Sequence, residues 1–183
     1  MARKLPRFLS FAEVSAMFDE SKVSVRDNML LKCMFYLGMR NSEVTDLLAG
    51  DIDIINGNVK IVQGKGAKDR YIPIPTVQFK QELKDFISNK GPDEKAFYIS
   101  GRQLRNIVKR YAETAKIRRF EEVHPHTLRH SYATLLQNRD TPLNIIQNLL
   151  GHARIETTTI YVHMGIEKMK EHVTKAFENN IVS

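Results

Sequence analysis

The apolar residues of this 183-residue chain recur at helical spacing almost throughout, except between residues 51 and 74, where they alternate. In that stretch two short runs, 52–54 and 59–61, flank Asn56-Gly57, and a third run follows at 71–74. Alternation puts every second side chain on one face of a strand, and Asn-Gly favours a tight hairpin turn. The pattern predicts a small three-stranded antiparallel sheet inside an otherwise helical chain.

Helix signals flank this sheet on both sides. Ser10 with Glu13 forms a capping-box pattern, and Thr141-Pro142 is a typical helix start. The predicted fold class is therefore mainly α with a small three-stranded antiparallel β-sheet, an α+β arrangement. In chain order, one helix is expected to begin after Ser10 and others near 25–37, 41–47, 79–87, 104–115, 126–136, 143–150, 157–163 and 166–177.

Positive charge exceeds negative charge, with 28 Lys and Arg against 21 Asp and Glu. The excess is concentrated in residues 101–119, where Glu113 is the one acidic residue among seven basic ones. Helical spacing there buries Leu104 and leaves Arg102 and Arg105 on the opposite side. A polyanion such as nucleic acid is the first partner to test, although a charge run alone favours a merely solvated helix face.

The single cysteine, Cys33, excludes an internal disulfide and a cysteine-based zinc site, and it favours a reducing compartment. No run of about twenty apolar residues occurs, as a membrane span would require. The six histidines lack ligand spacing with an acidic third ligand. We therefore predict a protein of a reducing, intracellular compartment that uses no metal or cofactor and contacts no membrane.

The prediction of catalytic residues depends on their order and spacing, because a single Arg, His or Tyr is more often structural or solvated. His126 and Arg129 are three residues apart at a helix start, so both could address one anion, helped by the helix N-terminus. Gly151-His152 follows a helix end, and Tyr161 comes nine residues after His152.

Five short motifs, in this order and spacing, resemble the catalytic domain of the tyrosine recombinases, the phage-integrase family, and especially its Xer-like branch. They are Gly38-Met39-Arg40-Asn41-Ser42-Glu43, Gly64-Lys65-Gly66, His126-Thr127-Leu128-Arg129-His130, Leu150-Gly151-His152 and Tyr161. The resemblance implies a site-specific DNA recombinase or integrase. Such an enzyme cleaves and rejoins DNA strands through a 3′-phosphotyrosine intermediate, without a metal.

The resemblance also implies a role for each motif residue. The pocket around the scissile phosphate would consist of Arg40, Lys65, His126, Arg129 and His152, with Tyr161 as the nucleophile. The residue types suit these roles, because arginine forks bind phosphate oxygens and stay charged at any working pH. A tyrosine with an ordinary pKa of about 10 needs a base, for which His126 is the candidate. Lys65 is the expected general acid, with Lys68 and Arg70 as rivals.

Other residues are expected to support this pocket or to contact DNA. Glu43 is expected to be a buried partner that positions Arg40, and His130 to make a hydrogen bond in the core. The five other tyrosines fall in apolar patterns and are expected in the core: Tyr36, Tyr71, Tyr98, Tyr111 and Tyr132. The candidate DNA contacts are Arg102, Arg105, Lys109, Arg110, Lys68 and Arg70.

The resemblance implies a single catalytic domain over residues 1–183, with 1–9 as a lead-in and no N-terminal core-binding domain. An excised catalytic domain is the expected interpretation, rather than a minimal recombinase. The segment 166–183 resembles the family's C-terminal helix that docks on a neighbouring protomer. A homotetramer on double-stranded DNA is therefore expected, with a monomer in isolation.

Two other functions stay open at this stage. A type IB topoisomerase uses the same chemistry to relax DNA, and a non-catalytic DNA-binding module could keep the same fold. The biological role is equally open among integration, chromosome-dimer resolution in chromosome segregation, and DNA inversion.

Overall fold

The computed structural model describes residues 7–62, 69–151 and 162–178, with backbone only for 162–165. The chain divides into two compact units, each described here by itself. The helical unit consists of Met1–Asp46 and Phe97–Thr134, and the sheet unit consists of Leu47–Ala96 and Leu135–Ser183.

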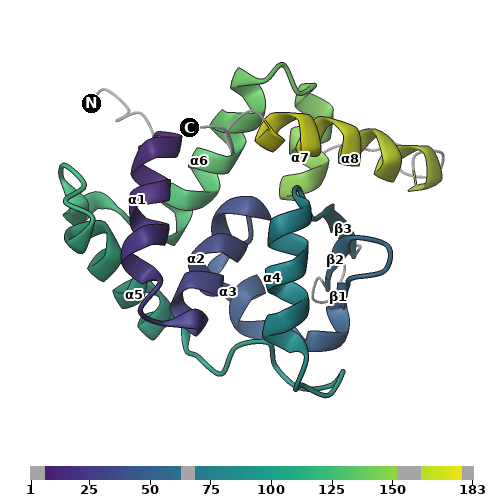
Figure 1. Ribbon diagram of the computed structural model, residues 1–183. Coiled ribbons are helices and arrows are strands. Elements are labelled where there is room, and N and C mark those ends of the chain that lie inside the picture. The colour runs from purple at the N-terminus through teal and green to yellow at the C-terminus, as the bar shows by residue number, and fades with distance from the viewer. Residues whose placement is uncertain (1–6, 63–68, 152–161, 179–183) are drawn as a thin grey trace. The chain divides into compact units, whose positions relative to one another are not determined.

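The helical unit holds most of the long helices, and in it α1 packs against α2 and α5, as Figure 1 shows. Ser10 caps α1 as predicted, because its hydroxyl accepts from the Glu13 N–H while the Glu13 carboxylate accepts from the Ser10 N–H. The elements are α1 (Phe11–Ser21), α2 (Val25–Tyr36), α3 (Asn41–Asp46), α5 (Gly101–Thr114), the 3₁₀ turn η2 (Phe120–Glu122) and α6 (Pro125–Asn138), whose last turn belongs to the sheet unit.

Aromatic rings form the centre of the helical unit. The ring of Phe35 on α2 lies 6.0 Å from that of Phe18 and 6.1 Å from that of Phe11, both on α1. Edge-to-face and tilted ring pairs of this kind stabilise a core beyond the area they bury. The near-continuous apolar run of α2 thus becomes the buried spine of this unit.

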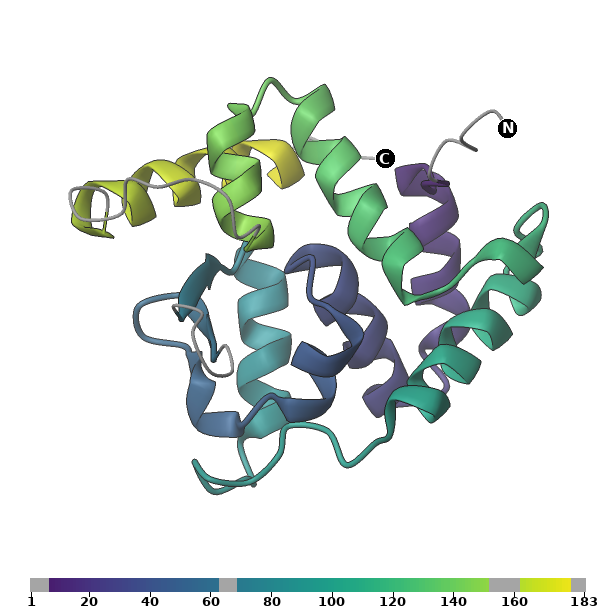
Figure 2. The ribbon, with the colours of Figure 1, turned by 180° about the vertical axis from the view of Figure 1, so that it is seen from behind.

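The sheet unit contains the predicted three-stranded antiparallel sheet, in the order β1-β2-β3. Val59 lies opposite Ile52 on one side and Ile72 on the other, so these three buried residues stack across the sheet. Figure 2 shows the same elements from behind. They are η1 (Ala49–Asp51), β1 (Ile52–Asp53), β2 (Asn58–Ile61), β3 (Arg70–Pro73), α4 (Val77–Ile87), α7 (Leu143–Leu150) and α8 (Val162–Glu178).

The first hairpin turn is longer than the predicted two-residue turn at Asn56-Gly57. Strand β1 ends at Asp53, whose carboxylate accepts from the Asn56 N–H at 2.9 Å and from the Asn56 side chain. These two donors hold the pKa of the Asp53 carboxyl below its usual value. Gly57 takes the left-handed conformation, with φ +67°, that closes the turn. The side chain of Asp53 therefore ends β1 early and leaves 54–57 as the connection.

Two helices pack on the outer strand β3 of the sheet unit, namely α7 and α8. Helix α7 ends at Gly151, which is left-handed with φ +63°, as the sequence predicts. Helix α8 is continuous from Val162 to Glu178, so the two short helices predicted near 157–163 and 166–177 are wrong for the part that the structure describes. Its residues Val173, Ala176 and Phe177 are buried in this chain.

Two predicted core tyrosines lie at the surface instead, since Tyr71 is 42% exposed and Tyr98 is 66% exposed. Tyr71 alternates with the buried Arg70 and Ile72 on β3, so it points to the opposite face of the strand. Tyr111 and Tyr132 are buried as predicted. Among the described residues, no helix is both long and apolar enough to cross a membrane.

Candidate active site

The turn between α2 and α3 brings Arg40 and Glu43 together. Gly38 has a left-handed backbone, with φ +57°, and redirects the chain just before Arg40. The Glu43 carboxylate then accepts from the Arg40 N–H and from the Arg40 guanidinium, each at 2.7 Å. The Glu43 side chain is 9% exposed and the Arg40 side chain 33% exposed. One end of the Arg40 guanidinium is thus fixed while the group still reaches solvent.

Arg129 on α6 reaches the same turn from a distant part of the sequence. Its Nη1 donates to the Gly38 carbonyl at 2.6 Å and lies 3.8 Å from Oε2 of Glu43. The Arg129 side chain is 8% exposed, so its charge needs these partners. The buried Glu43 carboxylate therefore serves two arginines, and the cluster retains one net positive charge.

Gly38 is required here for a second reason, which is close packing against α6. A Cβ at this position would lie 2.4 Å from Cδ1 of Tyr132. The backbone of the turn consequently approaches α6 closely enough for its carbonyl to accept from Arg129. The Tyr132 ring is buried at this contact.

His126 lies in the first turn of α6, three residues before Arg129, and its side chain is exposed. Partial desolvation is the main cause that lowers the pKa of the His126 imidazole below its ordinary value, followed by the charges of His124, Arg129 and Arg40. The ring of His124 lies 6.1 Å from the His126 ring. A lowered pKa keeps the imidazole neutral near pH 7, the form that can accept a proton.

His130 is exposed on α6 and does not lie in the core, where the sequence predicts it. It follows His126 by one helical turn, so both residues lie on the same side of α6. The buried side of the helix is instead occupied by Leu128 and Tyr132. His130 is therefore a solvent-facing neighbour of His126.

Four predicted site residues lie outside the described residues: Lys65, Lys68, His152 and Tyr161. The structure brings together Arg40, Glu43, His126 and Arg129, all in the helical unit.

The predicted DNA contacts fall into two groups. Arg102, Arg105 and Lys109 are exposed on α5, at spacings of three and four residues that place them on one helix face. Arg110 is 56% exposed, but its guanidinium also donates to the Asp27 carboxylate at 2.5 Å. This face retains three cations directed to solvent.

Arg70 differs from the other predicted DNA contacts, because it is only 9% exposed. Its Nε donates to the carbonyl of Leu149 at 2.9 Å, inside the sheet unit. A buried side chain bonded to a helix carbonyl is poorly placed to bind a phosphate.

Sequence reasoning missed the side-chain partners of Asp27, a buried carboxylate at the start of α2. It accepts from Arg26 and Arg110 and lies 3.3 Å from the hydroxyl of Tyr111. Burial raises the pKa of the Tyr111 phenol, and the negative charge of Asp27 adds to the effect. The signal in the sequence was the helical spacing that aligns Asp27 with the buried residues Leu30 and Leu31.

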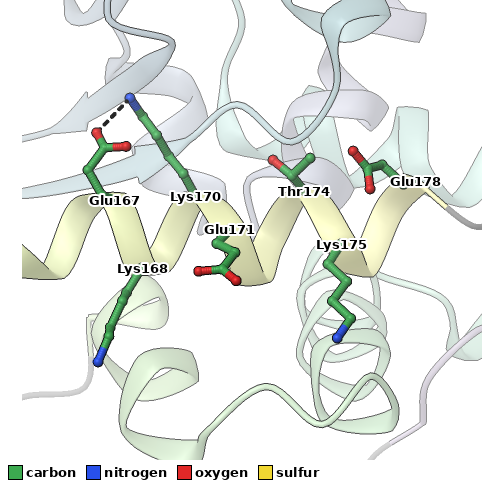
Figure 3. Close-up of a pocket in the computed structure, with 7 residues that line it drawn as sticks. All are labelled: Glu167, Lys168, Lys170, Glu171, Thr174, Lys175 and Glu178. Atoms are coloured by element: carbon green, nitrogen blue, oxygen red, sulfur yellow. Dashed lines mark hydrogen bonds and ion pairs between the residues drawn. The ribbon is translucent and has the colours of Figure 1, made fainter.

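The surface of α8 carries an open depression lined by residues of that helix, with acidic and basic side chains interspersed (Figure 3). Lys170 donates to Glu167 there at 3.3 Å. An exposed mixture of charges on one helix does not form a reactive centre. In the part of the chain that the structure describes, no three His, Cys, Asp or Glu side chains are grouped to hold a metal.

The fold has known counterparts among DNA integrases and recombinases. The structure of the lambda integrase catalytic core aligns with 82% of this chain and 94% of its own length, with a TM-score of 0.64 and 17% identity. The XerH site-specific recombinase, crystallised bound to its difH substrate, aligns with 93% of this chain and 55% of its own, at 29% identity and a TM-score of 0.69. The fold is thus that of an integrase catalytic core.

The sequence supports the same assignment. The profile of the phage integrase family matches residues 7–168, so the chain belongs to this family. A tyrosine recombinase of Pseudothermotoga lettingae is 31% identical over 185 residues, which cover 96% of this chain and 63% of that protein. The chain therefore spans a little less than two-thirds of the length of this curated relative.

Proposed function

We propose that this chain is the catalytic domain of a site-specific DNA recombinase, which cuts and rejoins strands through a 3′-phosphotyrosine intermediate. The observation that carries the proposal is the pair Arg40 and Arg129 on one buried carboxylate, with His126 beside them. Fixed guanidinium groups of this kind stabilise charge that develops on phosphate oxygens in a transition state. Membership of the phage integrase family supports the same chemistry.

In this mechanism Arg40 and Arg129 bind the non-bridging oxygens of the scissile phosphate. Glu43 holds the bound ends of both guanidinium groups, so little reorganisation is needed when the negative charge grows. The Arg40 side chain is 33% exposed, so a phosphate oxygen can approach it from solvent. A lysine at either position would lose the fork geometry that this arrangement depends on.

The covalent step is assigned to Tyr161. Its phenolic oxygen forms a bond to phosphorus, its proton passes to neutral His126, and the bond from phosphorus to the 5′-oxygen breaks. We assign Lys65 as the acid that protonates the leaving 5′-oxygen, and His152 as a further phosphate ligand. The reverse reaction with a different 5′-hydroxyl rejoins the strand, so neither hydrolysis nor a metal is required.

Double-stranded DNA is the proposed substrate, and the exposed cations of α5 are its proposed contacts: Arg102, Arg105, Lys109 and the exposed part of Arg110, together with Lys68. The crystallisation of the related XerH with its difH DNA supports this choice of partner. We infer a homotetramer on DNA, docked through the part of segment 166–183 that this chain does not itself bury, and action in the cytoplasm on nucleoid DNA.

The test uses a pool of nicked duplexes with randomised arms, in which the nick lets a short 5′-hydroxyl fragment escape after cleavage. With a chelator present, wild type is expected to form an adduct that survives denaturation and maps to Tyr161 by mass spectrometry. Tyr161→Phe should form none, and Arg40→Lys should form it much more slowly. DNA binding without any adduct from wild type would contradict the catalytic proposal and favour a binding module.

A further inference from the structure

Strand β3 carries a buried arginine in direct contact with the last turn of α7. Arg70 begins β3 and is 9% exposed, and its Nε donates to the Leu149 carbonyl at 2.9 Å. The two residues are 79 positions apart in the sequence, and both lie in the sheet unit. The contact therefore joins two elements that the chain does not connect directly.

The place of this contact on α7 explains why an arginine is used. The last four carbonyls of a helix have no partners within it, and the partial negative charge there favours a cation. Gly151 donates its N–H back to the Asn148 and Gln147 carbonyls. Arg70 supplies a donor to the Leu149 carbonyl, the next along the helix. The helix end is therefore held both by the left-handed glycine and by a charged side chain from β3.

We propose that Arg70 is a positioning residue of the recombinase, which fixes the C-terminal end of α7 to β3. The inference rests on the proposed function, because its consequence for catalysis comes through the residues next to this contact. His152 follows Leu149 by three residues, and Lys65 precedes Arg70 by five. The contact fixes the end of α7 to the start of β3, close in sequence to these two proposed catalytic residues.

Arg70 is therefore assigned to a different task from the exposed cations of α5. Removing a DNA contact lowers affinity and the dependence of binding on salt. Removing a positioning contact loosens the end of α7 and slows the chemical step while DNA affinity stays the same. The two effects can be measured separately in one set of variants.

The variants are Arg70→Met, which keeps an unbranched apolar stem without a donor, and Arg70→Lys, which restores a cation. Lys84→Met, on the exposed side of α4 in the same unit, controls for the change in charge. Hydrogen exchange is followed in peptides covering 143–151, with those of α4 as an internal reference for global unfolding. Single-turnover adduct formation and the Kd for duplex DNA are measured on the same proteins.

Arg70→Met is expected to speed exchange at the end of α7 at least tenfold relative to α4, and to slow adduct formation at least tenfold, with the Kd within twofold of wild type. Arg70→Lys should recover part of both losses, and Lys84→Met should match wild type. Unchanged exchange in 143–151, or a raised Kd with a normal adduct rate, would overturn the proposal. If wild type forms no adduct, the proposed function fails, and the exchange data still decide whether Arg70 anchors α7.

Discussion

Replacing Glu43 with glutamine tests the cluster most directly, because it removes one negative charge shared by two arginines and keeps the shape of the side chain. Glu43 accepts two bonds from Arg40 at 2.7 Å and lies 3.8 Å from Nη1 of Arg129. The glutamine oxygen can keep one of the two bonds from Arg40. The glutamine amide N–H₂ would face the other Arg40 N–H donor, so the second hydrogen bond is lost.

The expected loss of folding stability follows from these contacts. A hydrogen bond to a charged group contributes roughly 1.5–3 kcal/mol, and leaving a buried charge uncompensated costs roughly 3–5 kcal/mol. The Arg129 side chain is almost fully buried, but Arg40 is one-third exposed and water screens part of its loss. We expect about 3 kcal/mol in total, which corresponds to a fall in Tm of roughly 6–12 °C for a chain of this size.

Glu43→Gln should also slow adduct formation, because misplaced guanidinium groups stabilise the transition state less. If the same free energy, about 3 kcal/mol, is lost there, the rate falls roughly 100-fold. Thermal unfolding and single-turnover adduct formation measure the two effects, with Glu20→Gln on the exposed surface of α1 as control. A Glu43→Gln protein with a Tm within 1 °C and a rate within twofold of wild type would refute this account of the cluster.

Three further outcomes are expected from the same protein. Gly38→Ala should cost at least about 2 kcal/mol of stability in urea unfolding, because of the strained φ and the clash with Tyr132. The adduct rate should rise with pH through a value below the ordinary histidine pKa of about 6.5 and be level at pH 7, since the pKa of His126 is lowered and its neutral form is the base. Arg105→Gln should weaken duplex binding and reduce the salt slope by about one.

Each of these three expectations has a control variant and a result that would contradict it. Gly91→Ala, where a Cβ would meet no atom closer than 3.7 Å, should leave stability nearly unchanged, and an equally mild Gly38→Ala would argue against the close packing. The pH dependence should disappear in His126→Gln, and its persistence there would assign the base to another group. Gln103→Ala, exposed on α5 without a charge, should keep the salt slope of wild type. An unchanged slope in Arg105→Gln would remove Arg105 from the DNA contacts.

The secondary structure was largely predictable, because apolar spacing distinguishes helices from strands over runs as long as those of α2 and α5. The length of the first hairpin turn was not predictable, because the Asp53 side chain closes a longer turn than the Asn-Gly pair suggested. Periodicity wrongly placed Tyr71 in the core, because the apolar run 71–74 did not show which face of β3 is buried. In that strand Arg70 alternates with Tyr71 and shares the face of Ile72, so the sequence did contain the signal for its burial.

The candidate site was predictable in part. Arg40 and Glu43 are three residues apart, so a helix start brings them together by local geometry alone. The contact of Arg129 with Gly38 spans 91 residues, and only the family resemblance, not spacing, placed these two segments in one pocket. The pairing of Arg110 with Asp27, 83 residues apart, had no such guide and was missed.

The Gly38 contact has a consequence for how this pocket can be examined by mutation. The group that receives Arg129 is a backbone carbonyl, which every amino acid at position 38 would also possess. A scan of side chains cannot delete this acceptor and can only displace it by forcing the turn to change shape. Positions 38 and 132 must therefore vary together, and a smaller residue in place of Tyr132 is the change that would make room for a side chain at position 38.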